Sequence, residues 1–319
     1  MNTQQIEQHK GKLLFVVAVV FLLGIFSFQK TLALFWTEQT GSGSRNWVSL
    51  DSSSDGTKII AAVSGGYLYT STSSGVTWTE QTSSGIRDWS SVASSADGTK
   101  LVAAVNPTGY IYTSTSSGVT WMERQGAGQR SWTTVASSAD GAVLLIAGES
   151  TYPYLSIDSG ATWTEQTTLG SRIWRSAAVS SNGTFLTLTA VDERIFTSSD
   201  TGATWKLQVG AGSEGWQQIV SSADGTKLVA NPGGGFLKAS VDSGSNWTNL
   251  TAGPSSVSDV TSSSDGTKLA TVVNGGYIYT STDSGTTWAT STTAGQRDWS
   301  LISSSENGSV LLAGGELGV

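Results

Sequence analysis

The stretch Ser156-Ile-Asp-Ser-Gly-Ala-Thr-Trp163 decides the fold of this chain, because it recurs along most of its length. Residues 198–205, 240–247 and 281–288 share its pattern of Ser-x-Asp-x-Gly-x-x-Trp. Residues 71–78 and 114–121 keep the pattern with Ser73 and Ser116 at the aspartate position. The copies are 41 to 43 residues apart, and a period of this length is typical of solenoids and propellers.

The repeat contains a second column of tryptophans, eleven residues after the first. The first column is Trp36, Trp78, Trp121, Trp163, Trp205, Trp247 and Trp288; the second is Trp47, Trp89, Trp132, Trp174, Trp216 and Trp299, with Val257 in one unit. Short β-branched, aromatic or alternating stretches follow each second-column position, and Asp-Gly or Asn-Gly pairs such as Asp97-Gly98 separate them. Each unit therefore predicts four short antiparallel strands, with no room for a crossover helix.

The eight-residue motif resembles the Asp-box, or BNR, repeat of sialidase-like and photosystem II assembly factor-like propellers. The resemblance covers nearly all of residues 35–319 and implies that the motif forms the turn between the third and fourth strands of a blade. It gives the motif residues a structural role: Asp158, Asp200, Asp242, Asp283, Ser73, Ser116, Trp78, Trp121, Trp163, Trp205, Trp247 and Trp288. The physical reason is that the Asp or Ser oxygen accepts backbone N–H groups inside a tight turn. WD40 propellers are a poorer match, because the repeats contain no histidine.

We therefore predict an all-β domain over residues 34–319, a seven-bladed β-propeller of four-stranded antiparallel blades. The last unit has only its inner strands, near 299–304 and 309–313, whereas residues 35–40 form an unpaired outer strand at the start. We expect this N-terminal strand to join the last blade and close the ring, since an open array would expose an edge. An incompletely closed ring is the alternative.

Residues 1–33 are predicted to be a signal peptide or an N-terminal membrane anchor. Lys10 and Lys12 precede the apolar run 13–28, which could associate with a membrane, and small residues follow near Thr31. Both readings place the domain outside the cytoplasm, as a secreted, periplasmic or cell-surface protein.

Composition excludes several kinds of chemistry. The chain has no cysteine, and its one histidine, His9, lies in the targeting segment. We therefore expect no Ser-His-Asp triad, no metal site and no cofactor in the domain. The net charge of −7 would repel phosphate backbones, so nucleic acid is not expected as a partner.

Candidate binding residues lie on the face opposite the Asp-box turns. An arginine stands two residues before the second tryptophan in five units, at Arg45, Arg87, Arg130, Arg172 and Arg297. Together these guanidinium groups could bind carboxylates or acidic glycans. The alternative is that each arginine stacks on a neighbouring aromatic ring or bonds the backbone.

Departures from the repeat are a second signal for a site. They gather in the loops between the second and third strands of units three and four: Glu149, Tyr152 and Tyr154, then Asp192, Glu193 and Arg194. Glu214, which replaces arginine in unit five, adds to this uneven patch. Loop drift without function would give the same pattern.

Three classes of function remain open, and we favour the first. A non-catalytic binding or scaffold propeller would recognise a protein partner or an acidic glycan through the arginine-bearing face. A sialidase-like glycoside hydrolase would use carboxylate or tyrosine chemistry, but the Phe-Arg-Ile-Pro segment of sialidases is absent and no catalytic residue is assigned. A structural or adhesive cell-surface protein would also suit the Ser/Thr/Gly-rich composition.

Overall fold

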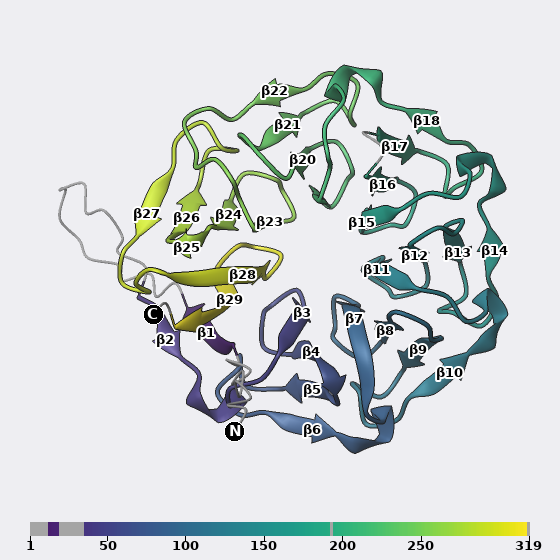
Figure 1. Cartoon of the computed structure of the whole chain (residues 1–319), viewed down its shortest axis with the longest axis horizontal. Coiled ribbons are helices and arrows are strands. Elements are labelled where there is room, and N and C mark those ends of the chain that lie inside the picture. Colours follow the sequence, from purple (N-terminus) through teal and green to yellow (C-terminus); the bar gives the residue numbers. More distant parts are fainter. Residues whose placement is uncertain (1–11, 19–34, 192–193, 318–319) are drawn as a thin grey trace, which may run out of the picture.

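The computed structural model describes residues 12–18, 35–191 and 194–317. Over these ranges the chain forms β-strands and short 3₁₀ turns. The sheets are antiparallel, most have four strands, and they are arranged radially around one axis (Figure 1). This arrangement is a β-propeller, so the prediction of an all-β propeller fold is confirmed.

Units 1 and 2 are two four-stranded units joined into one eight-stranded sheet, because β4 pairs with both β3 and β7. Unit 1 consists of β3 (Trp47–Ser52), β4 (Ile59–Gly66), β5 (Leu68–Ser71) and β6 (Thr79–Gln81). Unit 2 consists of β7 (Arg87–Ser94), β8 (Leu101–Val105), β9 (Ile111–Ser114) and β10 (Met122–Arg124).

Units 3 to 6 repeat the same strand order from the axis outward. Unit 3 consists of β11 (Trp132–Ser137), β12 (Leu144–Gly148), β13 (Tyr154–Ser156) and β14 (Thr164–Glu165). Unit 4 consists of β15 (Trp174–Val179), β16 (Leu186–Ala190), β17 (Arg194–Ser198) and β18 (Lys206–Leu207). Unit 5 consists of β19 (Gln218–Ser221), β20 (Leu228–Asn231), β21 (Lys238–Ser240) and β22 (Thr248–Asn249). Unit 6 consists of β23 (Asp259–Ser262), β24 (Leu269–Val272), β26 (Ile278–Ser281) and β27 (Ala289–Ser291), with β25 (Asn274–Gly276) pairing the next sheet.

The last sheet combines both ends of the chain. Its inner strands are β28 (Arg297–Ser304) and β29 (Val310–Leu317), and its outer strand is β2 (Thr37–Glu38). β2 joins this sheet as its outer strand, and β1 (Leu13–Ala18) lies between β2 and β29 and pairs with both, which the sequence did not lead us to expect. β1 belongs to the segment predicted to direct export; residues 1–11 and 19–34 lie outside the described residues, and export stays a prediction. No helix in the described part of the chain is long and apolar enough to cross a membrane.

Tryptophans of the second column hold neighbouring units together. Trp132, for example, is fully buried and packs against Ile111 and Val102 of the preceding unit. Five more occupy equivalent fully buried positions: Trp47, Trp89, Trp174, Trp216 and Trp299. A buried tryptophan removes about 200 Å² from water, which contributes on the order of 5 kcal/mol before entropic costs.

Backbone hydrogen bonds also link the units, at the turns between first and second strands. The N–H of Ser54 donates to the carbonyl of Ala96 at 2.8 Å, and the N–H of Ala96 donates to Ala139 at 2.8 Å. The same bond continues through Ser181, Ala223, Ser264 and Glu306, at N···O distances of 2.6 to 3.0 Å. Glu306 then donates to the carbonyl of Ser54 at 2.9 Å, so the chain of bonds returns to the residue where it began.

The turns between third and fourth strands have the hydrogen bonds expected of the repeated motif. Asp158 accepts the Thr162 N–H at 2.8 Å and the Thr162 hydroxyl at 2.6 Å, and the Ser156 Oγ accepts the Gly160 N–H at 2.8 Å. These hydrogen bonds lower the pKa of Asp158 to about 2. In unit 1 the Ser73 Oγ accepts the Thr77 N–H at 2.9 Å, so serine replaces the aspartate in this role.

We predict that Asp158→Ala destabilises the domain by about 1 kcal/mol, because it leaves the Thr162 N–H without its acceptor. Asp158→Ser should retain most of the stability, since Ser73 makes the equivalent bond in unit 1. Urea unfolding of the two variants measures the difference. Equal loss in both would contradict a capping role.

Two carboxylates on first strands also connect units. Asp259 accepts the Ile302 N–H of the last sheet at 2.7 Å, and Asp51 accepts the Ser94 N–H of unit 2 at 2.8 Å. Burial, only partly offset by these bonds, raises the pKa of Asp259 to about 7 and that of Asp51 to about 6. Because the folded state holds these protons more tightly than the unfolded chain, the two groups favour folding as the pH falls from about 7 towards 4.

We therefore predict that the free energy of unfolding rises on mild acidification from pH 8 to pH 5. Each pH unit over which only the folded state holds one of these protons adds about 1.4 kcal/mol. Asp259→Asn should raise stability at pH 8 and flatten the profile, because an amide oxygen can still accept the Ile302 N–H while the Gln218 Oε1 accepts the Val260 N–H at 2.8 Å. Chemical unfolding at several pH values measures this, and an unaltered profile would contradict it.

Candidate ligand-binding face

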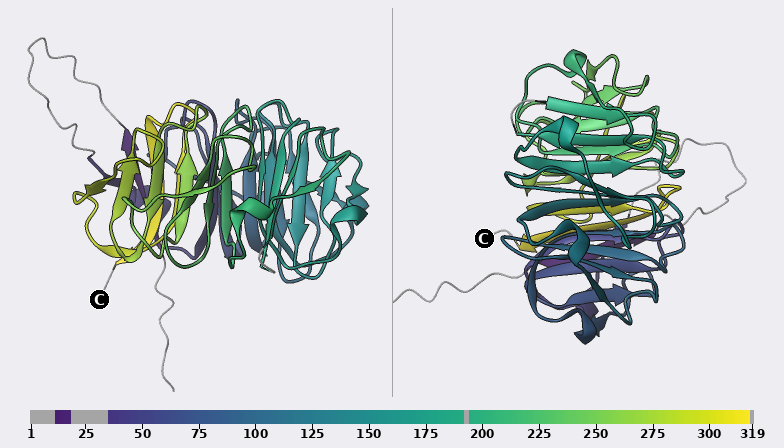
Figure 2. Two further views of the ribbon diagram at one scale, coloured as in Figure 1. Left: turned by 90° about the horizontal axis from the view of Figure 1, so that it is seen from above. Right: turned by 90° about the vertical axis from the view of Figure 1, so that its right-hand side faces the viewer.

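Seen from the side, the propeller has loops and turns on both of its faces (Figure 2). One face, here called the turn face, carries the linked turns and the motif turns described above. The other, here called the loop face, carries the loops that lead into first strands and those that join second to third strands. The predicted binding residues belong to the loop face.

The predicted arginines are half-buried and stack on aromatic rings. The Arg87 Cζ lies 4.3 Å from the ring centre of Tyr112 and 5.6 Å from that of Trp89. Equivalent stacking is made by Arg45 on Tyr69 at 4.5 Å, Arg130 on Tyr154 at 5.0 Å, Arg172 on Phe196 at 5.2 Å and Arg297 on Trp299 at 5.8 Å. Each arginine therefore contacts the aromatic core of its own sheet.

Most of these arginines also bond the turn that precedes their strand. Arg172 Nε donates to Leu169 O at 2.9 Å, and Arg297 Nε donates to Ala294 O at 3.1 Å. Arg45 and Arg87 donate to the final carbonyls of η1 (Thr40–Ser42) and η2 (Thr82–Ser84). These contacts match the structural alternative set out from the sequence; ligand binding by the arginines stays a prediction.

Unit 5 has a cation at this position that comes from a different element. Glu214 stands in the arginine column there, but Lys238 from β21 places its Nζ 5.5 Å from the ring centre of Trp216. The same Nζ donates to Ala211 O, the last carbonyl of η5 (Val209–Ala211), at 2.9 Å and to Glu214 Oε1 at 2.9 Å. In unit 5 the loop before the first strand thus carries the carboxylate of Glu214, and β21 carries the cation, Lys238. Glu214 belongs to this ion pair rather than to a separate patch.

Unit 6 shows the converse. Val257 replaces the tryptophan, and Ser255 stands two residues earlier where other units have a cation or Glu214. Unit 6 therefore lacks both the tryptophan ring and the cation, as expected if the role of the cation is to stack on that ring.

Tyrosine and glutamate complete the cluster in units 1 to 3. The Tyr112 hydroxyl donates to Glu123 Oε2 at 2.7 Å, and the Tyr154 hydroxyl donates to Glu165 Oε1 at 2.6 Å. Burial and the adjacent glutamate raise the pKa of both tyrosines. Each of these arginines thus has a carboxylate one hydroxyl away, which limits the net positive charge of the loop face.

The described residues among those predicted from departures in the repeat have different surroundings. Glu149 forms an exposed ion pair with Arg175 at 3.4 Å, and Tyr152 packs against the core between units 2 and 3. Tyr154 is buried and repeats the position of Tyr112, so grouping it with the departures was wrong. Arg194 is exposed at the start of β17, and Asp192 and Glu193 lie outside the described residues.

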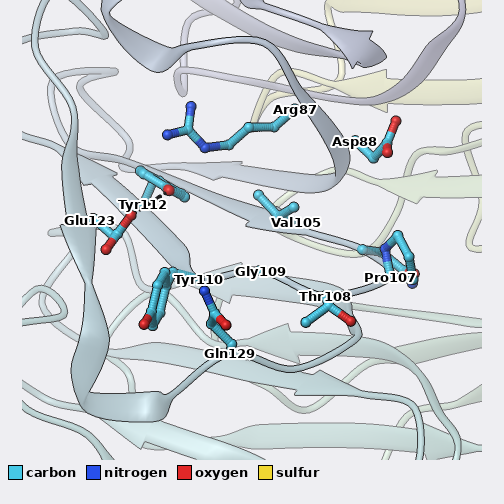
Figure 3. A pocket seen from close by; sticks show the side chains of 11 residues that line it. Arg87, Asp88, Val105, Pro107, Thr108, Gly109, Tyr110, Tyr112, Glu123 and Gln129 are labelled. Carbon is cyan, nitrogen blue, oxygen red and sulfur yellow. Dashed lines mark hydrogen bonds between the residues drawn. The ribbon is translucent and has the colours of Figure 1, made fainter.

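A pocket of about 340 Å³ lies on the loop face beside Arg87. Arg87 and Asp88 lie along one edge, and Tyr110, Gln129 and Thr108 lie along the opposite edge (Figure 3). The loop Asn106–Gly109 closes one end, and Glu123 lies beside Tyr112 at the other. This Asn-Pro-Thr-Gly loop departs from the Gly-Gly of units 1 and 6, which is the signal by which the pocket could have been found.

Carboxylate and guanidinium groups, two tyrosine rings and an amide make the pocket suitable for a polar group with both donors and acceptors. Among the described residues, no group of three or more histidine, aspartate or glutamate side chains is placed to hold a metal ion. The arrangement therefore offers hydrogen bonding and stacking.

Comparison with solved structures gives the fold. The YCF48 protein from Cyanidioschyzon merolae matches with a TM-score of 0.61 and 16% identity, over 84% of this chain and 94% of that one. YCF48 bound to a D1 peptide matches with a TM-score of 0.59 and 15% identity, over 86% and 94%. The β-propeller domain of Myceliophteria thermophila Cps50 (Swd1) matches with a TM-score of 0.62 and 11% identity, over 85% and 97%. No family model and no curated protein matches the chain.

We predict that Arg130→Ala destabilises the domain by about 1–2 kcal/mol, because it removes the cation from Trp132 and Tyr154. The control is Arg175→Ala, whose exposed ion pair with Glu149 should contribute less than about 0.5 kcal/mol. Urea unfolding measures both. Unchanged stability in Arg130→Ala would show that this arginine is dispensable for the fold.

Proposed function

We propose that this chain is an exported, non-catalytic propeller that binds a protein partner through its loop face. The observation that carries the proposal is the pocket beside Arg87, which joins a cation, two carboxylates, an exposed amide and a tyrosine ring in one open site. Such a site suits the mixed polar groups of a polypeptide segment.

We further propose that the propeller has seven blades and that β1 and β2 complete the seventh. The cyclic chain of backbone hydrogen bonds from Ser54 round to Glu306 supports closure, because an open array would leave one terminal carbonyl unpaired. The motif turns of units 1 to 6 support assignment to the Asp-box type, since each has the serine and the Asp or Ser acceptor in the same places.

A protein is favoured over an acidic glycan by the balance of charge. The repeated arginines stack on rings, most bond backbone carbonyls, and glutamates accompany those of units 1 to 3 through tyrosine hydroxyls. The pocket itself contains Asp88 and Glu123 beside Arg87, which disfavours a ligand of uniform negative charge. YCF48, a similar propeller, is described bound to a D1 peptide, which is an analogy at the level of the fold.

Gln129→Trp tests the proposal, because Gln129 is exposed at the pocket rim and a larger ring would fill the site. Gln296→Trp is the matched control: Gln296 is exposed one residue before Arg297, as Gln129 is before Arg130. Both variants and the wild-type protein are screened against immobilised random-sequence peptides. We expect Gln129→Trp to weaken the selected peptides at least about tenfold, or about 1.4 kcal/mol, and Gln296→Trp to leave them unchanged.

Sialylated and sulfated glycans and a fluorogenic sialoside are assayed in parallel. Glycan binding that both tryptophan variants tolerate would contradict the proposed partner, and turnover of the sialoside would contradict the non-catalytic role. Peptide binding unaffected by Gln129→Trp would remove the pocket from the site.

A further inference from the structure

The last sheet differs from the others in how its third strand is supplied. In units 1 to 6 the third strand follows the second along the chain, whereas in the last sheet β1 supplies it from a distant segment (Figure 1). β1 nevertheless has the same register. Val16 pairs with Leu312 and Phe15 with Ala313, just as Thr70 pairs with Ile60 and Tyr69 with Ala61 in unit 1.

The outer strand repeats this correspondence. Glu38 of β2 pairs with Phe15, as Glu80 of β6 pairs with Tyr69. The Lys12 N–H also donates to Arg45 O at 2.7 Å, and Arg45 N–H donates back to Lys12 O at 3.2 Å. Gly109 and Arg130 exchange the same pair of bonds between units 2 and 3. β29 on one side and β2 on the other therefore bound a complete third-strand slot, which β1 occupies.

The sequence of β1 is a poor match to that slot. The six other third strands end in a serine whose Oγ accepts the N–H four residues later, for example Ser71 with Gly75 at 2.9 Å and Ser281 with Gly285 at 2.9 Å. Val17 stands at this register position in β1. Thr70 accepts the Gln81 amide at 2.6 Å in unit 1, but Val16 stands at the corresponding position and the Gln39 amide donates instead to Thr37 O at 3.3 Å.

The link between the third and fourth strands also differs. In unit 1 the hydrogen-bonded turn 72–78 ties β5 to β6, whereas residues 19–36 separate β1 from β2. A long connection adds little to the stability of the strand it tethers. The pairing with β29 and β2 holds β1 in the sheet, in a segment whose composition also suits export.

We propose that the edge of β29 is a strand-acceptor site that binds an extended segment of a partner protein with the pattern Ile/Leu–Tyr/Phe–Thr–Ser, in place of β1. Antiparallel pairing along β29 supplies the affinity, and the apolar–aromatic–hydroxyl order supplies the specificity, since the third strands of units 1, 2, 4 and 6 share it at residues 68–71, 111–114, 195–198 and 278–281. β1 is the occupant in the full-length chain. This site is separate from the pocket on the loop face and does not depend on it.

The test uses the full chain with Phe15→Pro and Val16→Pro, since two adjacent prolines remove ladder donors on both sides of β1. The probe is a synthetic peptide of residues 276–281, which carries Ile278-Tyr-Thr-Ser281. The prolines should lower the melting temperature by at least about 5 °C, and the peptide should restore part of it while a scrambled peptide does not. If the variant does not fold alone, refolding with the peptide must recover its circular dichroism; failure to recover overturns the proposal.

Register gives a sharper readout, because the chain has no cysteine of its own. A peptide with Tyr279→Cys should form a disulfide with Ala313→Cys and not with Leu312→Cys, and a peptide with Thr280→Cys should do the reverse, since neighbouring residues point to opposite sheet faces. Crosslinking should fall several-fold when β1 is intact. Crosslinking without register, a variant that melts like the wild-type chain, or disulfides between two protein copies in place of the peptide would each overturn the proposal.

Discussion

The structure depends on one backbone hydrogen bond that is repeated from sheet to sheet. Each turn between first and second strands donates an N–H to the next turn and accepts one from the turn before. This requirement explains the Asp-Gly and Asn-Gly pairs, because the glycine must adopt positive φ while the neighbouring unit packs against it. A Cβ at Gly98 would lie 2.7 Å from Lys58 Cδ, and one at Gly225 would lie 2.4 Å from the Phe185 ring. Local turn geometry and contact between sheets therefore select the same residue.

Much of the fold could be predicted from the sequence, because the same pattern of strands and turns recurs in each unit. The tryptophan columns, the glycine turns and the serine of the third strand all lie where their spacing indicated. The place of residues 13–18 could not be predicted, since a run of leucine, phenylalanine and valine suits a targeting segment and a buried strand equally. Pairing with β29 is a long-range choice that local sequence does not encode.

The site was harder to predict for a different reason. The arginine column suggested a ligand, but its meaning depended on which ring lay beneath each guanidinium. The exchange of charge between Glu214 and Lys238 is visible only when β21 is placed beside the leading loop of its own unit. The repeated cations make their contacts within the fold. We therefore expect a ligand to be recognised by residues that differ from the repeat. The loop Asn106–Gly109 is such a break, and it borders the pocket beside Arg87.

Unit 6 lacks both the tryptophan and the cation, so the junctions between units are not equally stable. Val257 is buried in a small cluster with Val260 and Leu237, where other seams hold a fully buried indole. This seam adjoins unit 6, whose other neighbour is the sheet completed by β1. The junction between units 5 and 6 is thus weaker than the junction of unit 6 with the last sheet, where Trp299 is fully buried and the Ile302 N–H bonds Asp259. Amide hydrogens at this junction should exchange first. A force applied to the domain should also separate the units there first, so the junction acts as a hinge because it lacks the buried indole.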